Sequence, residues 1–322
     1  MLMNISSGPS VWCSSTFEKK ESFLDIREYL SAVHQGLDTD EVIKSQALRD
    51  MASRVVDICE RGQGVAVLRG LDIKAHAKSE LVEFYANLCS LMGGVVSQNR
   101  NGDKLVSVSN KRMGSLSDSN VRAYDTDQGL SFHSDSSDIT GLLCINNSQS
   151  GGDSMVVSAG HIHNLILSDH REFLALYYNG FLYDARGEET SGSPAYRNSV
   201  FYFAESRLSC RFYLADYISP GLEKLGLSLS ETERSALQLF ADLCADPENH
   251  ISFKMMPGDI VFYSNNAVLH ARQPFRSCAN PDEDRLLYRT WINPHDFRSF
   301  PADFAKYRFG YDNPPSAPRM AR

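Results

Sequence analysis

Apolar residues recur at helical spacing in two segments near the start of the chain. Between Asp40 and Glu60 they fall at steps of three and four residues, which predicts an amphipathic helix. A second such segment runs from Ser79 to Met92 and ends at Gly93-Gly94, where glycine commonly stops a helix. The apolar run Gly64 to Arg69 between them predicts a buried strand. Helix, strand and helix therefore precede the core.

Beyond residue 100 the pattern changes to short runs rich in β-branched and aromatic residues, which are typical of a β-sandwich or barrel. One more helix is expected from Ser230 to Cys244, because Ser230 and Glu233 have the spacing of a capping box. We expect it to pack outside the sheets. The predicted strands are Lys104–Ser109, Ile139–Ile145, Ser154–Ser158, Val200–Ala204, Ser209–Leu214, Ile251–Met255, Asp259–Tyr263 and Leu286–Ile292.

The two ends of the chain lack this periodicity. Residues 1–40 are polar and serine-rich, so we interpret them as an N-terminal extension over the core, and 311–322 as a C-terminal tail. One domain is expected over 41–310, a length that can bury one large core.

Composition narrows the class of protein. The formal net charge is −8 and no Lys/Arg run exceeds a pair, which disfavours nucleic acid and anionic membranes as partners. No stretch has the length and apolarity of a membrane span or a secretory leader. The seven cysteines include no Cys-x-x-Cys and are odd in number, so a reducing, cytoplasmic location is expected.

The segment Leu130 to Asp135 holds a candidate metal-binding pair. On an extended segment, residues two apart face the same side, so His133 and Asp135 project together. A His-x-Asp pair is weak evidence by itself. His270 offers a third ligand, because a Pro257-Gly258 turn starts a β-rich run that ends at this histidine. Two histidines and one carboxylate leave coordination positions of iron open for oxygen chemistry.

Two arginines follow the third ligand. Arg285 and Arg289 are four residues apart in a predicted strand and should share one face. A buried guanidinium needs an anionic partner, which a dicarboxylate co-substrate would provide. Arg285 could instead form an ion pair with Asp282, Glu283 or Asp284, and Arg289 a structural ion pair. Ser154, after the turn Gly151-Gly152, places a hydroxyl shortly after the strand of His133 and Asp135, or is only a turn hydroxyl.

In order along the chain, these motifs resemble the taurine dioxygenase and clavaminate synthase (TauD/TfdA) family of iron(II)/2-oxoglutarate oxygenases over roughly residues 62–310. No motif is specific singly; jointly they are. The motifs are Gly64-Val-Ala-Val-Leu-Arg-Gly70, Phe132-His-Ser-Asp135, Gly151-Gly-Asp-Ser154, Pro257-Gly-Asp-Ile260, Asn266 to His270 and Arg285-x-x-x-Arg289.

The resemblance implies a double-stranded β-helix of jelly-roll type with outer helices. It also implies the cofactor iron(II), the co-substrates 2-oxoglutarate and O₂, and stimulation by ascorbate. His133, Asp135 and His270 match the catalytic iron ligands, and Arg285 matches the residue that binds the distal carboxylate of 2-oxoglutarate. Ser154 stands where the family often has a threonine that serves the same co-substrate.

For the substrate, the resemblance points to Arg289, with Arg122 and Tyr124 at the mouth of the pocket. The expected reaction is hydroxylation, or another C–H oxidation, of a small carboxylate-bearing or amino-acid-derived metabolite, in secondary metabolism. Desaturation and ring closure by the same family are the alternatives. Asp135 argues against halogenation, because related halogenases lack this carboxylate. The expected partner is a small-molecule substrate, and assembly into a homo-oligomer is left open.

Two further hypotheses come from other classes of protein. His161-Ile-His163 is similar to the His-x-His of cupin metalloenzymes that need no 2-oxoglutarate, although the next glutamate is Glu172 and a helix would turn the two histidines apart. A jelly-roll protein without catalytic activity would bind its ligand with no metal.

Overall fold

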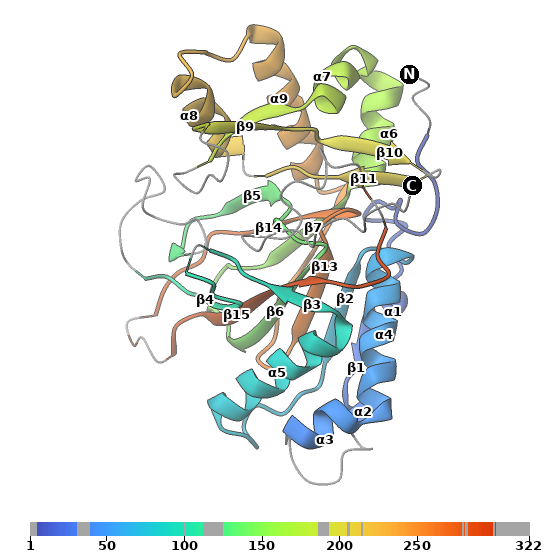
Figure 1. The fold of residues 1–322 in the computed structure, drawn as a ribbon, viewed down its shortest axis with the longest axis vertical. Coiled ribbons are helices and arrows are strands. Elements are labelled where there is room, and N and C mark those ends of the chain that lie inside the picture. Colours follow the sequence, from blue (N-terminus) through green and yellow to red (C-terminus); the bar gives the residue numbers. More distant parts are fainter. Residues whose placement is uncertain are drawn as a thin grey trace, which may run out of the picture.

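We analysed a computed structural model of the chain, which describes residues 5–30, 39–99, 101–111, 125–185, 193–204, 207–213, 215–278, 280, 283–298 and 300, with 39–41 and 204 as backbone only. Two sheets face each other at its centre (Figure 1). The larger has the order β1 (Phe23–Asp25), β2 (Val65–Arg69), β13 (Ile260–Ser264), β6 (Ile139–Asn146), β15 (Leu286–Asn293) and β3 (Gly94–Val96), and β4 (Leu105–Val108) also pairs with β15.

The smaller sheet has four strands in the order β12 (His250–Phe253), β7 (Ser154–Ser158), β14 (Val268–Arg272) and β5 (Leu130–His133). Apolar side chains from both sheets meet in one buried cluster that includes Val67, Val156, Val261 and Leu287. Alternate residues of these strands therefore face the space between the sheets. The predicted mainly β, jelly-roll core with outer helices is confirmed.

Helices cover the outer faces of both sheets (Figure 1). On the larger sheet, α4 (Gln46–Glu60) and α5 (Lys78–Met92) pack against residues such as Leu143 and Phe262. On the other side, α6 (Ala159–Asp169) and α9 (Glu231–Ala245) enclose a second apolar cluster. The predicted capping box is present, since the Ser230 hydroxyl accepts from the Glu233 backbone while the Glu233 carboxylate accepts from the Ser230 backbone.

The remaining elements are short. They are α1 (Lys19–Ser22), α2 (Arg27–Leu30), α3 (Thr39–Lys44), the 3-10 turns η2 (Arg171–Phe173) and η3 (Ala215–Tyr217), α7 (Leu174–Asn179), α8 (Ile218–Glu223), and the two hairpins of β8 (Phe181–Asp184) with β9 (Ala195–Asn198) and β10 (Phe201–Ala204) with β11 (Arg207–Cys210).

The described part of the N-terminal segment is built into the domain instead of lying over it as an extension. Strand β1 runs parallel to β2 and adds an edge to the larger sheet. Trp12 is only 3% exposed, joins the cluster between the sheets, and donates from its indole nitrogen to the Gln63 carbonyl at 2.8 Å. A large aromatic ring buries much apolar surface, so one tryptophan can fix a segment whose other residues are mostly polar. The expected tail, 311–322, lies outside the described residues.

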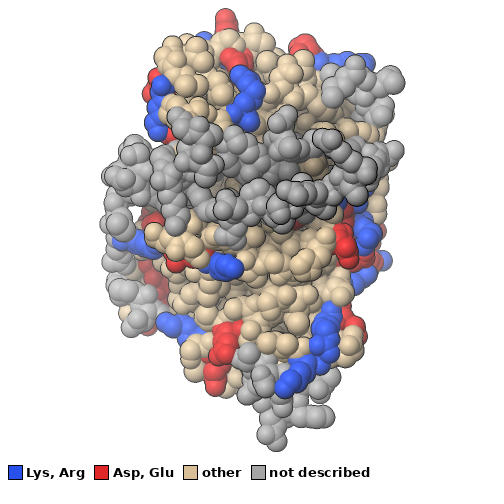
Figure 2. Space-filling model, in the orientation of Figure 1, with Lys and Arg blue, Asp and Glu red and all other residues tan. Residues whose placement is uncertain are grey.

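The described surface carries charges of both signs. On the face in Figure 2, lysine and arginine side chains alternate with acidic ones around the described surface, without a broad basic area. No disulfide joins any of the seven cysteines, all of which lie in the described ranges. None of the helices in the described ranges is long and apolar enough to cross a bilayer.

Candidate active site

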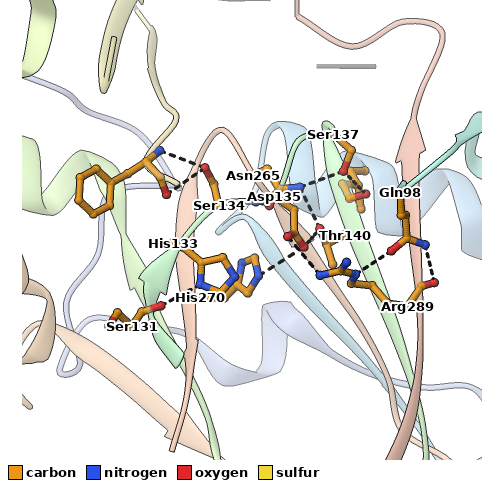
Figure 3. A network of polar contacts seen from close by, with 12 residues as sticks. Gln98, Ser131, His133, Ser134, Asp135, Ser137, Thr140, Asn265, His270 and Arg289 are labelled. Carbon is orange, nitrogen blue, oxygen red and sulfur yellow. Dashed lines mark hydrogen bonds and ion pairs between the residues drawn. The ribbon is translucent and has the colours of Figure 1, made fainter. Parts of the chain in front are cut away.

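Two histidines that are distant in sequence face each other across neighbouring strands. His133 ends β5 and His270 lies in β14, and the two residues are direct partners in the antiparallel ladder. Their ring centroids are 4.5 Å apart. With Asp135 they form a group whose candidate ligand atoms all lie within 4.8 Å of one another (Figure 3). It is the one such group of three among the described residues.

Asp135 lies two residues after the end of β5 and is held from several sides. Its backbone N–H donates to the Asn265 side-chain oxygen at 2.9 Å, and its Oδ2 accepts from the Thr140 hydroxyl at 2.8 Å. Its Oδ1 lies 3.4 Å from Nη1 of Arg289 (Figure 3). Burial raises the pKa of Asp135, but the Arg289 guanidinium and the two imidazoles outweigh burial and hold this pKa well below its usual range. The carboxylate is therefore ionised and oriented.

His133 has the protonation state that metal ligation requires. Nδ1 of His133 lies 2.8 Å from the Ser131 carbonyl, so this nitrogen carries the proton and Nε2 keeps its lone pair. Burial, and then the facing His270, lower the pKa of His133 to about 4. The His270 ring stacks on Tyr263 with 4.8 Å between centroids and 6° between planes, which fixes its orientation.

This donor set fits iron(II). Two imidazoles and one ionised carboxylate, brought together by β5 and β14, are ligands that non-haem iron sites use, and they leave other coordination positions for further ligands. The sequence prediction that His133, Asp135 and His270 lie close together is confirmed by the structure.

Arg285 lies near Tyr263, the ring on which His270 stacks. It is 4% exposed, and its Nε and Nη1 are buried without a hydrogen-bond partner. Burial lowers the pKa of Arg285 to about 10. Ser154 is also buried, and its hydroxyl lies near that of Tyr263. Burial raises the pKa of Tyr263 to about 12, although Ser154 and the nearby Arg285 lower it. The interior beside His270 therefore presents a cation and two hydroxyls.

The alternative of an ion pair for Arg285 finds no support among the described residues. The carboxylate of Asp284 accepts from two backbone N–H groups, those of Arg285 at 2.8 Å and Cys278 at 3.2 Å. No contact between the Arg285 guanidinium and Glu283 is formed in the described chain. Asp282 lies outside the described residues. A buried guanidinium without an anion is costly, which indicates a site for an anionic ligand.

Arg289 faces the interior as predicted, but its position adds a contact that the sequence did not indicate. Its Nε donates to the Gln98 side-chain oxygen at 2.7 Å, while the Gln98 amide donates to the Arg289 carbonyl at 2.8 Å (Figure 3). Its Nη1 faces the iron-ligand candidate Asp135. Contact of Arg289 with substrate remains a prediction, and Arg122 and Tyr124 lie outside the described residues.

The cupin hypothesis is wrong for His161 and His163. Both lie on helix α6, where residues two apart point in different directions. Nε2 of His161 is 2.9 Å from the side-chain oxygen of Asn249, and Nε2 of His163 is 3.0 Å from the Tyr178 hydroxyl. Neither belongs to a potential metal-binding group in the described chain. Both are polar groups satisfied within the packing around α6.

Sequence reasoning missed the residues that hold Asp135 in place. Thr140 and Asn265 form a small network, in which the Asn265 amide donates to the hydroxyls of Thr140 at 3.0 Å and Ser137 at 3.1 Å. Asn265 and Asn266 follow a run of apolar residues and are fully buried, which is an unusual place for two amides. The two asparagines could have been noticed in the sequence as candidate site residues, whereas nothing in the sequence around Thr140 or Gln98 marks them as such.

The chain is similar in sequence to a known protein family and to named relatives. The model of the family described as "Taurine catabolism dioxygenase TauD, TfdA family" matches residues 28–291. A protein called FR-33289 synthase, from Streptomyces rubellomurinus (strain ATCC 31215), is 34% identical over 321 residues, covering 94% of this chain and 95% of the relative. Taurine hydroxylase-like protein SAT17 from Stachybotrys chartarum (strain CBS 109288 / IBT 7711) is 23% identical, covering 85% of this chain and 76% of its own.

Solved structures share the fold at low identity. Asparagine oxygenase in complex with Fe(II), 2S,3S-3-hydroxyasparagine and succinate has a TM-score of 0.57 at 16% identity, covering 84% of this chain and 92% of that one. The non-heme iron oxygenase OrfP in complex with Fe and alpha-ketoglutaric acid also gives 0.57 at 16%, covering 84% and 93%.

Proposed function

Because the chain belongs to the taurine catabolism dioxygenase TauD, TfdA family, an iron(II)- and 2-oxoglutarate-dependent class of dioxygenase, we propose that it oxidises a C–H bond of a small metabolite at the His133, Asp135 and His270 site. The observation that carries this proposal is the convergence of these three side chains in a domain interior that also holds Arg285, whose Nε and Nη1 are buried without a hydrogen-bond partner. A metal ion and a dicarboxylate would together satisfy both features.

Some of these residues would hold the metal and others the co-substrate. His133, with its proton held by the Ser131 carbonyl, offers Nε2 to iron(II), and His270 and Asp135 complete the ligand set. Arg285 binds the distal carboxylate of 2-oxoglutarate, and Ser154 adds a hydroxyl. When bound, iron(II), 2-oxoglutarate and O₂ supply the oxidant that breaks the C–H bond, with release of succinate and CO₂.

We infer that the substrate is a carboxylate-bearing or amino-acid-derived metabolite. Two structures of the same fold support this class, one of asparagine oxygenase with hydroxyasparagine and one of OrfP with (3S)-hydroxy-L-Arg. The 34% identical relative is named as a synthase, which supports a biosynthetic step. Arg289, together with Arg122 and Tyr124, is the proposed contact to the substrate, and Arg289 would reach it from its position beside Asp135.

Hydroxylation is the proposed outcome, with desaturation or ring closure as the second candidate because all begin with removal of hydrogen. The test is to incubate the protein with iron(II), 2-oxoglutarate, ascorbate and a panel of amino acids and small acids, and to follow both succinate and product mass. Gain of one oxygen atom by a panel member supports hydroxylation, whereas loss of two hydrogen atoms supports the second candidate. Failure to consume 2-oxoglutarate under any of these conditions, with iron bound, would contradict the proposal.

A further inference from the structure

A further arginine, besides Arg285 and Arg289, faces the interior of the domain. Arg272 lies on β14 two residues after His270, so both side chains point to the same face of the strand. Its ladder partner on β7 is Ser154, as Val156 is the partner of His270. Arg272 therefore lies two residues along the strand from His270. It is also the direct partner of Ser154, whose hydroxyl is expected to serve the co-substrate.

Part of the Arg272 guanidinium is fixed by backbone. Its Nη2 donates to the Thr126 carbonyl at 2.8 Å and to the Gln128 carbonyl, which sets the orientation of the planar group. Arg272 is only 5% exposed, and its Nε and Nη1 are buried without a hydrogen-bond partner. A purely structural arginine at such depth would be expected to use these donors within the protein, because unmade buried hydrogen bonds are costly.

The two arginines lie against one aromatic ring. The guanidinium carbons of Arg272 and Arg285 lie 5.0 and 5.3 Å from the centroid of the same ring, that of Phe275. Each has Nε and Nη1 unpartnered. Guanidinium groups stay cationic in proteins, so two like charges share a buried region, and an anion between them would relieve their repulsion.

We propose that Arg272 is a second cationic contact for the distal carboxylate of the 2-oxo acid co-substrate, acting with Arg285 in one buried clamp. This inference rests on the proposed function. A carboxylate has two oxygens and about four acceptor positions, so it can receive donors from two guanidiniums and a hydroxyl together. The carbonyls of Thr126 and Gln128 hold the Arg272 guanidinium in position before the ligand arrives.

The test compares two keto acids in the iron(II)-loaded protein without oxygen. 2-Oxoglutarate and 2-oxopentanoate share the iron-binding end, but the second has a methyl group in place of the distal carboxylate. Binding is followed by the weak visible band of a keto acid on iron(II). Arg272→Gln should weaken binding of 2-oxoglutarate by about 10- to 100-fold, the loss expected from one charge-assisted contact. Its binding of 2-oxopentanoate should be unchanged.

Arg276→Gln is the matched control, because Arg276 is exposed in the same segment and should leave both affinities as in the unaltered protein. Arg272→Lys keeps the charge and should recover part of the 2-oxoglutarate affinity, and it replaces the glutamine variant if that variant does not fold. Equal weakening of both keto acids, or no change for 2-oxoglutarate, would overturn the assignment and leave Arg272 as a support for residues 126–128. If the unaltered protein binds iron(II) but gives no band with 2-oxoglutarate, the proposed function fails first and this inference with it.

Discussion

Arg289 and Asp135 form an ion pair inside the domain, with 3.4 Å between Nη1 of the arginine and Oδ1 of the carboxylate. Both side chains are buried, and Gln98 fixes the arginine from its other side. The pair keeps Asp135 ionised before any metal binds, since Arg289 is the main charge that lowers its pKa. Arg289 thus prepares a ligand, in addition to the contact with substrate predicted for it.

Replacement of Arg289 should therefore affect the metal. Arg289→Gln removes the charge beside Asp135, and we expect iron(II) affinity to fall by about 10- to 100-fold, as for other groups that orient metal ligands. Anaerobic titration of iron(II) measures this. Arg171→Gln, at an exposed position on η2, serves as control. Unchanged iron affinity with a loss of turnover only would assign Arg289 to the substrate alone.

Thr140 should contribute through its hydroxyl. Thr140→Val keeps the shape but removes the donor to Asp135 and the acceptor for Asn265. We expect a loss of about 1–3 kcal/mol in the free energy of unfolding, because buried polar groups lose their partner, together with weaker iron(II) binding. Chemical denaturation with and without iron(II) checks both effects. Thr140→Ser should restore most of the loss, and a valine variant as stable as the original protein would show that the hydroxyl is not needed.

Arg285 should dominate co-substrate affinity. Arg285→Ala leaves the distal carboxylate of 2-oxoglutarate in a buried pocket without its main partner, at a cost of about 2–5 kcal/mol. That corresponds to a weakening on the order of 30- to several-thousand-fold, read from the visible band. Arg285→Lys should recover only part, because an ammonium cannot make the two-pronged contact. A retained affinity in the alanine variant would place the carboxylate elsewhere.

Trp12 tests whether the N-terminal segment belongs to the fold. Trp12→Ala removes a buried ring that packs edge-on against Phe17 at 4.9 Å, and should lower the free energy of unfolding by about 3–5 kcal/mol. Ile5→Ala, in the same segment but at a residue that is 73% exposed, should change it by no more than about 0.5 kcal/mol. Similar effects of the two substitutions on urea denaturation would mean that the segment is a detachable extension.

Regular elements with strong periodicity were predictable from sequence. The strand at Ile139 and the helix after Ser230 begin within one residue of the expected position, because the capping residue and the apolar runs act locally. The helix α6 was not assigned, although its N-cap Ser158 accepts from the His161 backbone, because the same serine also ends β7. The buried role of Trp12 depends on contact with Gln63, which no local pattern reveals.

The candidate site divides in the same way. His133, Asp135 and His270 were predictable because each sits in a recognisable motif. The part that Thr140 plays depends on sheet register, which sets it opposite Tyr263 on one side and Trp291 on the other. Arg272 was overlooked because one arginine after an apolar strand resembles an exposed strand end. Only the paired sheets make it an interior residue.

The most direct test of the central claim is the iron content and visible spectrum of the anaerobic protein, with His133→Ala, His270→Ala and His161→Ala in parallel. The account predicts one iron(II) per chain and a visible band on addition of 2-oxoglutarate for the unaltered protein and for His161→Ala, whose histidine is bonded to Asn249 away from the site. His133→Ala and His270→Ala should lose both. Full iron binding with the band in either ligand variant, or stoichiometric iron without any band in the unaltered protein, would contradict it.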